Sequence, residues 1–356
     1  MSRNSVKLSD IAQKAGVSTV TVSNALAGRK GVSRQMRDKI LETACECGYD
    51  MSRYEKKDNP QETIGILVSD RYIRVGMSFY WEMYQKVAFC LSQYGMYSTL
   101  EILNREEETA AKPGLPRCLE SGQADQLIII GRIEKTYLDR LMQKAEGRTV
   151  LLDFRDPDYN CSSVLSNNGI GMYRAVQYLI DHGHRDIGFV GTMEASGNIR
   201  ERFFAYRKCL EDNQLLLHPE WILNDRRTDN EAITGVELPV RLPTAFACSS
   251  DYAASILKEA LSARNLRIPT DISLTSYDDY LYGDPLEKKL TTFHVDMVKM
   301  AEKAVQALLR NRKTPNRAMN WYVDSVLVER ESVAPPIRLK SGAEHVGQRV
   351  WVRISH

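Results

Sequence analysis

A short segment near the N-terminus carries side chains that can read the edges of DNA bases. Thr19 and Val20 stand together, and Asn24 follows about one helical turn after Val20. A threonine hydroxyl can contact any base edge, valine can pack on the thymine methyl group, and an asparagine amide can form two hydrogen bonds with adenine. In a helix these side chains can enter a major groove together. The alternative is that Val20 belongs to the core and Asn24 is an ordinary surface residue.

The surroundings of this segment can hold phosphate groups. The first 39 residues carry eight Lys or Arg against two Asp, although the net charge of the whole chain is only +2. A small basic region on a mildly acidic body favours a phosphate-bearing partner, although a solvated basic face would give the same pattern. Hydroxyl and cationic side chains suit contacts with the DNA backbone, which position a protein without reading sequence. Those expected to do so are Ser18, Thr21, Ser23, Arg29 and Lys30.

The apolar pattern predicts the elements that hold these side chains. In 8–15 the apolar residues recur at the spacing of one helical face, and Gly16 can take the left-handed conformation that ends a helix. A second helix is predicted over 19–26, capped by Ser18, and a third begins at Ser33. Two short helices joined by a tight turn and followed by a third predict an all-α helix-turn-helix head over residues 1–49.

The remainder of the chain changes character after a linker. Residues 50–62 are charged, contain a proline and have no apolar period, which is typical of a hinge. From residue 63 to 332, strand-like runs alternate with helical stretches, which predicts an α/β core of two lobes with doubly wound parallel sheets. The expected strands are 64–68, 98–103, 126–130, 150–154, 187–190, 245–249 and 272–277. The expected helices are 81–94, 133–146, 169–182, 201–212, 253–264 and 296–310.

The absence of several sequence features disfavours other classes of protein. No apolar run reaches the roughly 20 residues that span a bilayer, and the N-terminus lacks the apolar core of a signal peptide, so a cytoplasmic location is expected. The seven cysteines are scattered without zinc-ligand spacing, which indicates reduced thiols and no metal site. No catalytic or nucleotide-binding motif is present. Asp278 and Asp279 are adjacent on an expected strand and so point to opposite faces. We therefore expect no catalytic residue and no cofactor.

Three stretches of the chain carry a family resemblance. Segment 8–23 contains LSDIA, AGVS and TVS, 179–191 reads LIDHGHRDIGFVG, and 268–279 reads IPTDISLTSYDD. In these stretches the chain closely resembles the lactose/galactose-repressor (LacI/GalR) family of bacterial transcription regulators. The resemblance implies a two-lobed core similar to periplasmic sugar-binding proteins. It also implies a homodimer that binds double-stranded operator DNA and a small-molecule effector, which in most members is a sugar.

The resemblance bears on both the head and the hinge. Thr19, Val20 and Asn24 match base-reading positions of the family. The family hinge carries paired leucines that wedge into the minor groove, whereas this chain has no leucine there and Asp58 lies near the wedge position. Either a neighbouring Met or Tyr replaces the wedge, or the central base step is not kinked. The hinge residues expected to contact DNA are Arg53, Tyr54 and Lys56.

The resemblance also implies a ligand site at strand ends. A polyhydroxylated ligand needs carboxylates and amides that pair with its hydroxyls, together with an aromatic face. Asp153 and Asp278 match ligand positions of the family, and either Arg200 or Arg202 has suitable spacing for an expected arginine. Ser250 stands where many relatives carry Asn, so one amide contact is missing. The expected effector-binding residues are Ser69, Trp81, Asp153, Arg200, Arg202, Ser250 and Asp278.

Structural roles compete with these ligand roles. Asp278 can cap a following helix, Trp81 can belong to the core or to a dimer surface, and the arginines can form surface ion pairs with neighbouring glutamates. The stretch Ile199-Arg200-Glu201 resembles galactoside-binding members, which tilts the expected effector toward a galactoside. The tail 333–356 has no counterpart in the family pattern, and its role does not follow from the sequence.

Three functions remain open at this point. A sugar-responsive repressor requires both the basic head and the ligand site. A transport-type sugar-binding protein would require a signal peptide and no basic head, contrary to the sequence. A third class is a regulator of the same family that binds a non-sugar effector, binds none, or activates its genes. Such a protein would have the same head and would differ in the ligand site of the core or in its effect on transcription.

Overall fold

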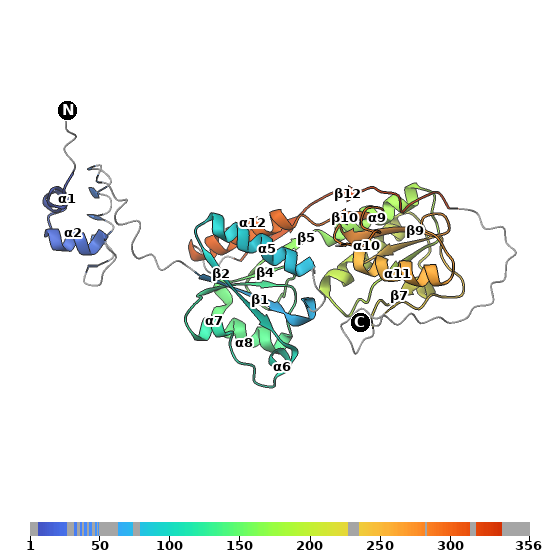
Figure 1. Cartoon of the computed structure of the whole chain (residues 1–356), viewed down its shortest axis with the longest axis horizontal. Coiled ribbons are helices and arrows are strands. Elements are labelled where there is room, and N and C mark those ends of the chain that lie inside the picture. Colours follow the sequence, from blue (N-terminus) through green and yellow to red (C-terminus); the bar gives the residue numbers. More distant parts are fainter. Residues whose placement is uncertain are drawn as a thin grey trace, which may run out of the picture. The chain divides into compact units, whose positions relative to one another are not determined.

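The computed structural model divides into two compact units, residues 1–62 and 63–356, each with its own core (Figure 1). The described residues are 6–26, parts of 32–49, and 63–73, 79–226, 235–281, 283–313 and 318–336.

The first unit contains the two predicted helices, α1 (Leu8–Ala15) and α2 (Thr19–Leu26). Gly16 ends α1 with φ 72°, a conformation that costs a residue with a side chain far more than glycine. The Ser33 hydroxyl accepts a hydrogen bond from the backbone N–H of Met36 at 3.3 Å, which agrees with the predicted start of a third helix. The buried apolar core joins all three segments and consists of Ile11, Ala12, Ala15, Val22, Ala25, Leu26, Ile40 and Ala44.

The second unit begins with a lobe built on a six-stranded sheet in the order β11-β5-β4-β3-β1-β2, in which all neighbours are parallel. Its strands are β1 (Thr63–Ser69), β2 (Tyr97–Leu103), β3 (Gln126–Ile130), β4 (Thr149–Leu152), β5 (Ser162–Ser166) and β11 (Asn320–Val323). Its helices are α5 (Phe79–Gln93), α6 (Arg105–Thr109), α7 (Arg117–Glu120), α8 (Lys135–Ala145) and α12 (Met297–Lys313), with 3-10 turns η1 (Asp70–Tyr72) and η2 (Glu146–Arg148).

The second lobe repeats this plan with the order β12-β10-β9-β8-β6-β7, where only the β10–β12 pair is antiparallel. Its strands are β6 (Ile187–Val190), β7 (Ile222–Leu223), β8 (Ala245–Cys248), β9 (Ser273–Asp278), β10 (Thr291–His294) and β12 (Leu327–Val328). Its helices are α9 (Asn168–Asp181), α10 (Gly197–Asp212) and α11 (Asp251–Ala263), with the 3-10 turn η3 (Pro219–Trp221).

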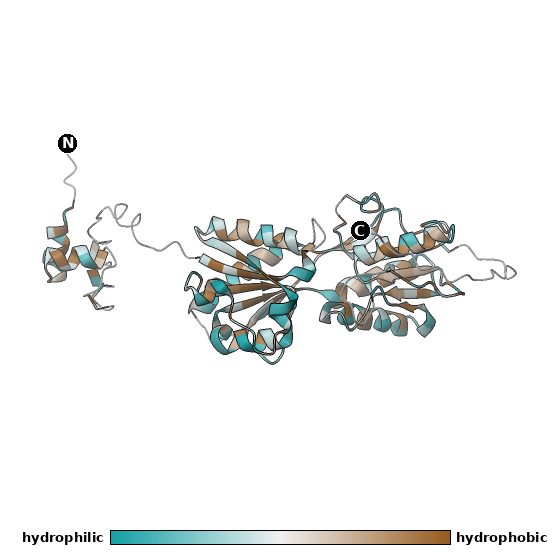
Figure 2. Ribbon diagram, turned by 60° about the horizontal axis from the view of Figure 1, so that its bottom comes forward, coloured by the Kyte–Doolittle hydropathy of each residue, from teal (hydrophilic) through white to brown (hydrophobic). Residues whose placement is uncertain are grey.

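The central strands are buried along nearly their whole length because helices cover both faces of each sheet. In β1, Ile66 and Val68 belong to the cluster that includes α5, whereas Leu67 between them belongs to the cluster that includes α8. This alternation follows from the two-residue period of a strand. Figure 2 shows the result, with apolar residues concentrated on the strands and polar residues along the outer surfaces of the helices.

The chain passes between the two lobes three times within the described residues, at 166–168, 294–297 and 323–327. As a consequence α12 covers the first lobe although it follows a strand of the second. The carboxyl end of β4 and the segment that follows β6 are joined by a hydrogen bond from Asn198 Nδ2 to the Asp153 carbonyl at 2.9 Å. Residues from both lobes therefore meet at one crevice.

The elements confirm the α/β prediction and add strands that the apolar pattern did not reveal. The seven expected strands are present with shifts of one or two residues at their ends, but β5, β7, β10, β11 and β12 were not expected. The sequence of β5 is SSVLS, so its buried serines hide it from a search for apolar runs. Helix α10 begins at Gly197 rather than at the predicted residue 201, because the Ser196 hydroxyl caps it by accepting a bond from Ile199 N–H at 3.1 Å.

The core extends slightly past its predicted C-terminal boundary. Packing extends to Ala334, whose carbonyl lies 2.9 Å from His184 Nε2 and accepts from the Ser273 hydroxyl at 3.0 Å, beyond the predicted boundary after residue 332. Among the described residues, no helix has the length and apolar character required to cross a membrane.

Candidate functional site

Helix α2 presents the three predicted base-reading residues on its open face. Val20 is 66% exposed, so the alternative that it belongs to the core is wrong. Thr19 is exposed and Asn24 is half-buried, whereas Val22 and the residues at the end of α2 face the core. An exposed β-branched side chain flanked by hydroxyl and amide groups is available for contacts with another molecule.

The hydroxyl residues of this helix have local bonds as well. The Ser18 hydroxyl accepts a bond from Thr21 N–H at 3.0 Å and lies 2.8 Å from the Thr21 hydroxyl, which confirms the predicted cap. Ser23 is half-buried beside Asn24. The remaining predicted DNA contacts, which lie outside the described residues, are Arg29, Lys30, Arg53, Tyr54 and Lys56.

The second candidate site is centred on Arg202 of α10. Its side chain is 5% exposed. Nε donates to the Asn168 side-chain oxygen at 2.8 Å, and Nη1 donates to the Ser249 carbonyl at 2.6 Å and lies 3.3 Å from Asp278 Oδ1. The guanidinium also stacks 3.6 Å from the centre of the Tyr277 ring. Bonds from three directions therefore hold one orientation of this cation.

The carboxylates of the site stand on unusual backbone. Asp153 follows β4 with φ 64°, Asp278 ends β9 with φ 115°, and Asp279 follows with φ 55°. Left-handed conformations are strained for residues with side chains and are often retained where a side chain has a function. Asp279 pairs with His294 at 2.9 Å and Arg330 at 2.7 Å, away from Asp278. Adjacent aspartates thus have separate environments, as predicted.

A cavity of about 220 Å³ lies at the crevice between the lobes. The Tyr80 hydroxyl donates to Asp153 Oδ2 at 2.9 Å, and Asn198 binds the carbonyl of the same aspartate. Arg202 and Asp278 are not among the residues that line this cavity. Arg202 is connected to the lining through Asn168, whose amide nitrogen donates to Glu201 at 3.0 Å and to Asn198 at 3.2 Å. The lining of the cavity includes Tyr72, Tyr80, Arg132, Asp153, Asn198 and Glu201.

Burial sets the electrostatics of this site. It raises the pKa of the Asp153 carboxyl to about 6, although Arg202 and the Tyr80 hydroxyl oppose the increase. Burial also raises the pKa of Asp278 well above its usual range despite Arg202, and neighbouring carboxylates add to the rise. Burial disfavours the charge on Arg202, yet Asp278, Tyr277 and Asp153 raise its pKa. One buried cation is therefore shared by several acids.

The structure brings only some of the predicted ligand residues together. Asp153, Asp278 and Arg202 influence one another electrostatically, whereas Arg200, the other candidate arginine, is exposed. The Ser250 hydroxyl caps α11 by accepting a bond from Ala253 N–H at 3.1 Å. Elsewhere, the buried Ser69 accepts from Arg71 Nε at 2.9 Å, and the Trp81 ring packs on Tyr84 with centres 5.3 Å apart. Trp81 does not line the cavity.

Residues that the sequence did not indicate complete the site. Tyr80, and not the predicted Trp81, is the aromatic residue beside Asp153. The Tyr72 ring packs on the Tyr80 ring with centres 4.4 Å apart. Asn168 and Asn198 supply side-chain amides at this site, whereas position 250 holds a serine and supplies none. Both asparagines lie near the amino ends of helices that follow strands, a position that could have marked them.

Comparisons with known proteins agree with this two-part organisation. Residues 7–52 match the model for bacterial regulatory proteins of the lacI family, and residues 176–333 match the model for the periplasmic binding protein-like domain. The chain is 27% identical over 333 residues to the ribose operon repressor of Haemophilus influenzae, covering 92% of this chain and 98% of that protein. It is 26% identical over 334 residues to the transcriptional repressor PurR of Photobacterium profundum, with the same coverage.

Solved structures show the same fold. A lac repressor dimer bound to operator and the anti-inducer ONPF matches with a TM-score of 0.60 and 21% identity, covering 93% of this chain and all of that chain. The transcriptional regulator CelR in complex with cellobiose matches with a TM-score of 0.63 and 22% identity, covering 92% and 99%. The relatives named here are regulators and not enzymes. The chain therefore joins a lacI-family DNA-binding domain, residues 7–52, to a periplasmic-binding-protein-like domain, residues 176–333.

Proposed function

We propose that this protein represses an operon for the use of a sugar and leaves its operator when a small polyhydroxylated molecule binds between the two lobes. One observation carries the proposal. Asp153 of the first lobe and Asp278 of the second stand at the carboxyl ends of parallel strands, and both interact electrostatically with Arg202 of α10. Ligands of doubly wound folds bind at such strand ends.

The head supplies the sequence-specific contacts. Thr19, Val20 and Asn24 contact base edges, because Thr19 and Val20 are exposed and Asn24 is only half-buried, while the other face of α2 packs in the core. The phosphate contacts come from Ser18, Thr21 and Ser23 together with Arg29 and Lys30, and hinge contacts come from Arg53, Tyr54 and Lys56. As a regulator of chromosomal genes, the protein acts in the cytoplasm. The lac repressor structure, whose chain has this fold, is a dimer bound to operator.

The chemistry of the cleft favours a neutral ligand with several hydroxyls. Asp153 and Glu201 can accept hydrogen bonds from hydroxyls, and the amide of Asn198 can both donate and accept. The rings of Tyr72 and Tyr80 border the same cavity and can cover a sugar ring. The related CelR structure with cellobiose fits this class, and the Ile199-Arg200-Glu201 stretch favours a galactoside.

Coupling between the two sites follows from thermodynamics. A ligand that binds one arrangement of the lobes better than the other changes the fit of the two heads to the operator. By linkage, operator DNA must then lower ligand affinity by the same factor. The test uses the full-length protein and a duplex selected from a random library.

We expect the selected duplex to bind at least about 10³-fold more tightly than a shuffled one at physiological salt. Intrinsic tryptophan fluorescence then reports titrations with methyl β-D-galactoside, D-galactose, D-ribose and cellobiose, and the sugar that binds should release the duplex. Equal retention of selected and shuffled duplexes contradicts the proposal. Specific DNA binding without a response to any sugar supports a regulator with a different effector or none.

The dimer surface is predicted to include α5. Phe89 on this helix is 67% exposed, and Tyr97 and Ile102 of the adjacent β2 are also exposed. Phe89→Glu is expected to weaken dimerisation by about tenfold or more, because a charge would be desolvated in an apolar interface. Sedimentation velocity measures the change. Phe204→Glu on α10 is the matched control, and an equal effect of both changes would argue against α5 as the interface.

Tyr80 is predicted to compete with the ligand. Because its hydroxyl occupies Asp153 Oδ2, Tyr80→Phe is expected to tighten ligand binding about tenfold or more, since a hydrogen bond to a charged group contributes about 1.5–3 kcal/mol. Tyr84→Phe, on the same helix but away from Asp153, is the control. Fluorescence titration gives both affinities, and weaker binding by Tyr80→Phe would show that the hydroxyl helps to hold the ligand.

The same site predicts a pH dependence. An ionised Asp153 accepts ligand hydroxyls, and its pKa is about 6, so affinity is expected to increase as the pH rises through 6 and to level off above it. The Tyr80 hydroxyl lowers this pKa, so Tyr80→Phe should move the midpoint to higher pH. Titrations at a series of pH values measure the midpoint. A flat profile between about pH 5 and 8 would remove Asp153 from the binding site.

A further inference from the structure

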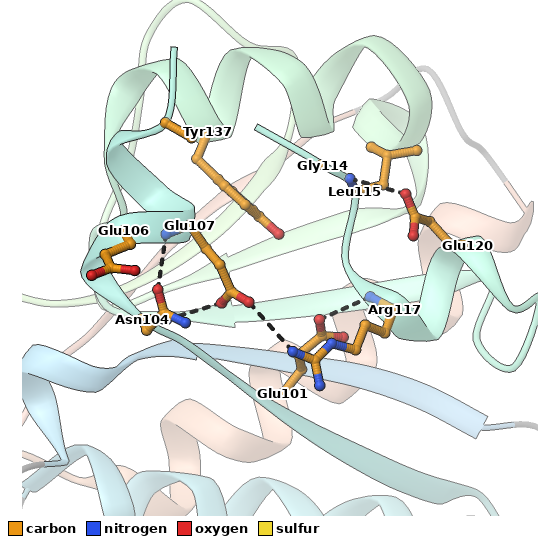
Figure 3. Close-up of a pocket in the computed structure, with 10 residues that line it drawn as sticks. Glu101, Asn104, Glu106, Glu107, Gly114, Leu115, Arg117, Glu120 and Tyr137 are labelled. Carbon is orange, nitrogen blue, oxygen red and sulfur yellow. Dashed lines mark hydrogen bonds and ion pairs between the residues drawn. The ribbon is translucent and has the colours of Figure 1, made fainter. Parts of the chain in front are cut away.

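A second pocket lies in the first lobe and shares no lining residue with the crevice between the lobes. Its volume is about 530 Å³, which is within the range of pockets that hold small molecules. It is formed by the end of β2, the start of α6, the segment that leads to α7, and α8 (Figure 3). The polar and charged lining residues are Glu101, Asn104, Glu106, Glu107, Arg117, Glu120 and Tyr137.

The lining is strongly acidic, although part of this charge has a structural use. Glu101 accepts bonds from the backbone N–H groups of Arg117 at 2.8 Å and Cys118 at 3.2 Å, at the start of α7. Glu107 accepts a bond from Asn104 N–H at 3.2 Å in a capping box. Each carboxylate has about four acceptor positions, so these bonds leave capacity for further donors. Acidic residues of this kind would not by themselves indicate a ligand.

Tyr137 supplies an independent indication. It is 3% exposed and belongs to the same buried apolar cluster as Leu138 and Leu141. Figure 3 shows the hydroxyl at the end of this ring, pointing into the pocket. No hydrogen bond joins this hydroxyl to another described residue, and the hydroxyl borders the pocket without being enclosed by protein, so a ligand atom can reach it. The Tyr137 hydroxyl is therefore available for a hydrogen bond with a ligand in the pocket.

We propose that this pocket binds a small aliphatic polyamine, whose ammonium groups bond to Glu101, Glu106, Glu107 or Glu120 and to the Tyr137 oxygen. Ammonium groups are strong donors without an acceptor, which suits a pocket in which four carboxylates face one resident cation, Arg117, paired with Glu107 at 3.4 Å. Burial and the nearby Glu101 and Glu107 raise the pKa of Tyr137, so its oxygen stays protonated and adds no second charge. Among the described residues, no cluster of three acidic, His or Cys side chains could hold a metal ion.

The test measures spermidine binding to the full-length protein without DNA, by isothermal titration calorimetry at low salt. We expect saturable binding of one spermidine per chain, with an affinity that falls as salt is added. The uncharged 1,8-octanediol, a chain of similar length, should not bind. Tyr137→Phe retains the buried ring and should weaken spermidine binding about three- to tenfold, as expected for the loss of one hydrogen bond.

A second variant tests the charge without altering the core. Glu106→Gln with Glu120→Gln changes two exposed side chains and should weaken spermidine binding about tenfold or more. Tyr252→Phe and Glu259→Gln, two exposed positions on α11, are the matched controls and should bind as the wild type does. Circular dichroism verifies that each variant is folded.

Three outcomes would overturn the proposal. The first is no saturable heat with spermidine up to about 10 mM, which corresponds to less than about 3 kcal/mol of binding free energy. The second is unchanged affinity in both the Tyr137 and the glutamate variants, which places the amine elsewhere. The third is binding of an arginine-rich peptide but not of spermidine, which identifies the pocket as a contact for a basic protein segment. DNA binding and sugar titration do not involve this pocket, so failure here leaves the proposed function intact.

Discussion

Arg202→Leu is expected to abolish the response to ligand and to lower the free energy of unfolding of the core by about 3–5 kcal/mol, the usual cost of leaving a buried charge without its counter-ion. The guanidinium is the cation shared by Asp278 and Asp153, and it also donates to Asn168 and to the Ser249 carbonyl. Leucine fills much of the volume but replaces none of these bonds.

The measurement combines chemical denaturation with operator release. In the variant, the selected duplex should still bind, because the head has its own core, but the sugar that releases the wild type should no longer do so. Arg200→Leu is the matched control, two residues earlier on the same helix and exposed, and it should retain both stability and response. A normal response by Arg202→Leu would exclude this arginine from the ligand site.

Val20→Ala combined with Asn24→Ala is expected to weaken binding to the selected duplex by about 10²-fold or more, since each specific base contact contributes about 1–3 kcal/mol. Binding to a shuffled duplex should change little, because phosphate contacts supply the nonspecific affinity. The expected result is therefore a smaller ratio between the two affinities. Neither change should unfold the head, because Val20 is 66% exposed and Asn24 is half-buried.

Fluorescence anisotropy at two salt concentrations separates this effect from a general loss of DNA binding. The control is Gln13→Ala, an exposed residue on α1 outside the predicted recognition helix, which should leave the ratio unchanged. An unchanged ratio in the α2 variant would mean that another element reads the sequence. Melting of the variant at the same temperature as the wild type would verify that the head is intact.

The ligand site illustrates how far local pattern can identify function. Asp153 and Asp278 were expected at the ligand site because they match ligand positions of the family, and the structure places both at the ends of strands, where ligands of parallel sheets bind. The choice between Arg200 and Arg202 was not predictable. Both positions have suitable spacing, and only the packing of α10 against the second lobe buries one of them.

The predicted aromatic residue of the ligand site, Trp81, differs from the one that the structure places beside Asp153, and the reason is again tertiary packing. Trp81 and Tyr80 are neighbours on α5, and helical neighbours point in directions about 100° apart. The rotation of α5 on the sheet turns Tyr80 toward Asp153, whereas Trp81 packs along the helix on Tyr84. Periodicity identifies the helix, but the rotation depends on the neighbouring strands.

The sequence by itself determined the head, because α1, α2 and the Gly16 turn depend on contacts within a few residues and on the spacing of apolar side chains. It also determined the alternation of strands and helices in the core. Only the tertiary structure decided which polar groups meet, since Asp153 reaches Asn198 and Arg202 reaches Asp278 across 45 and 76 residues of chain. Such contacts depend on strand order and on three passages between lobes, and no local spacing encodes them.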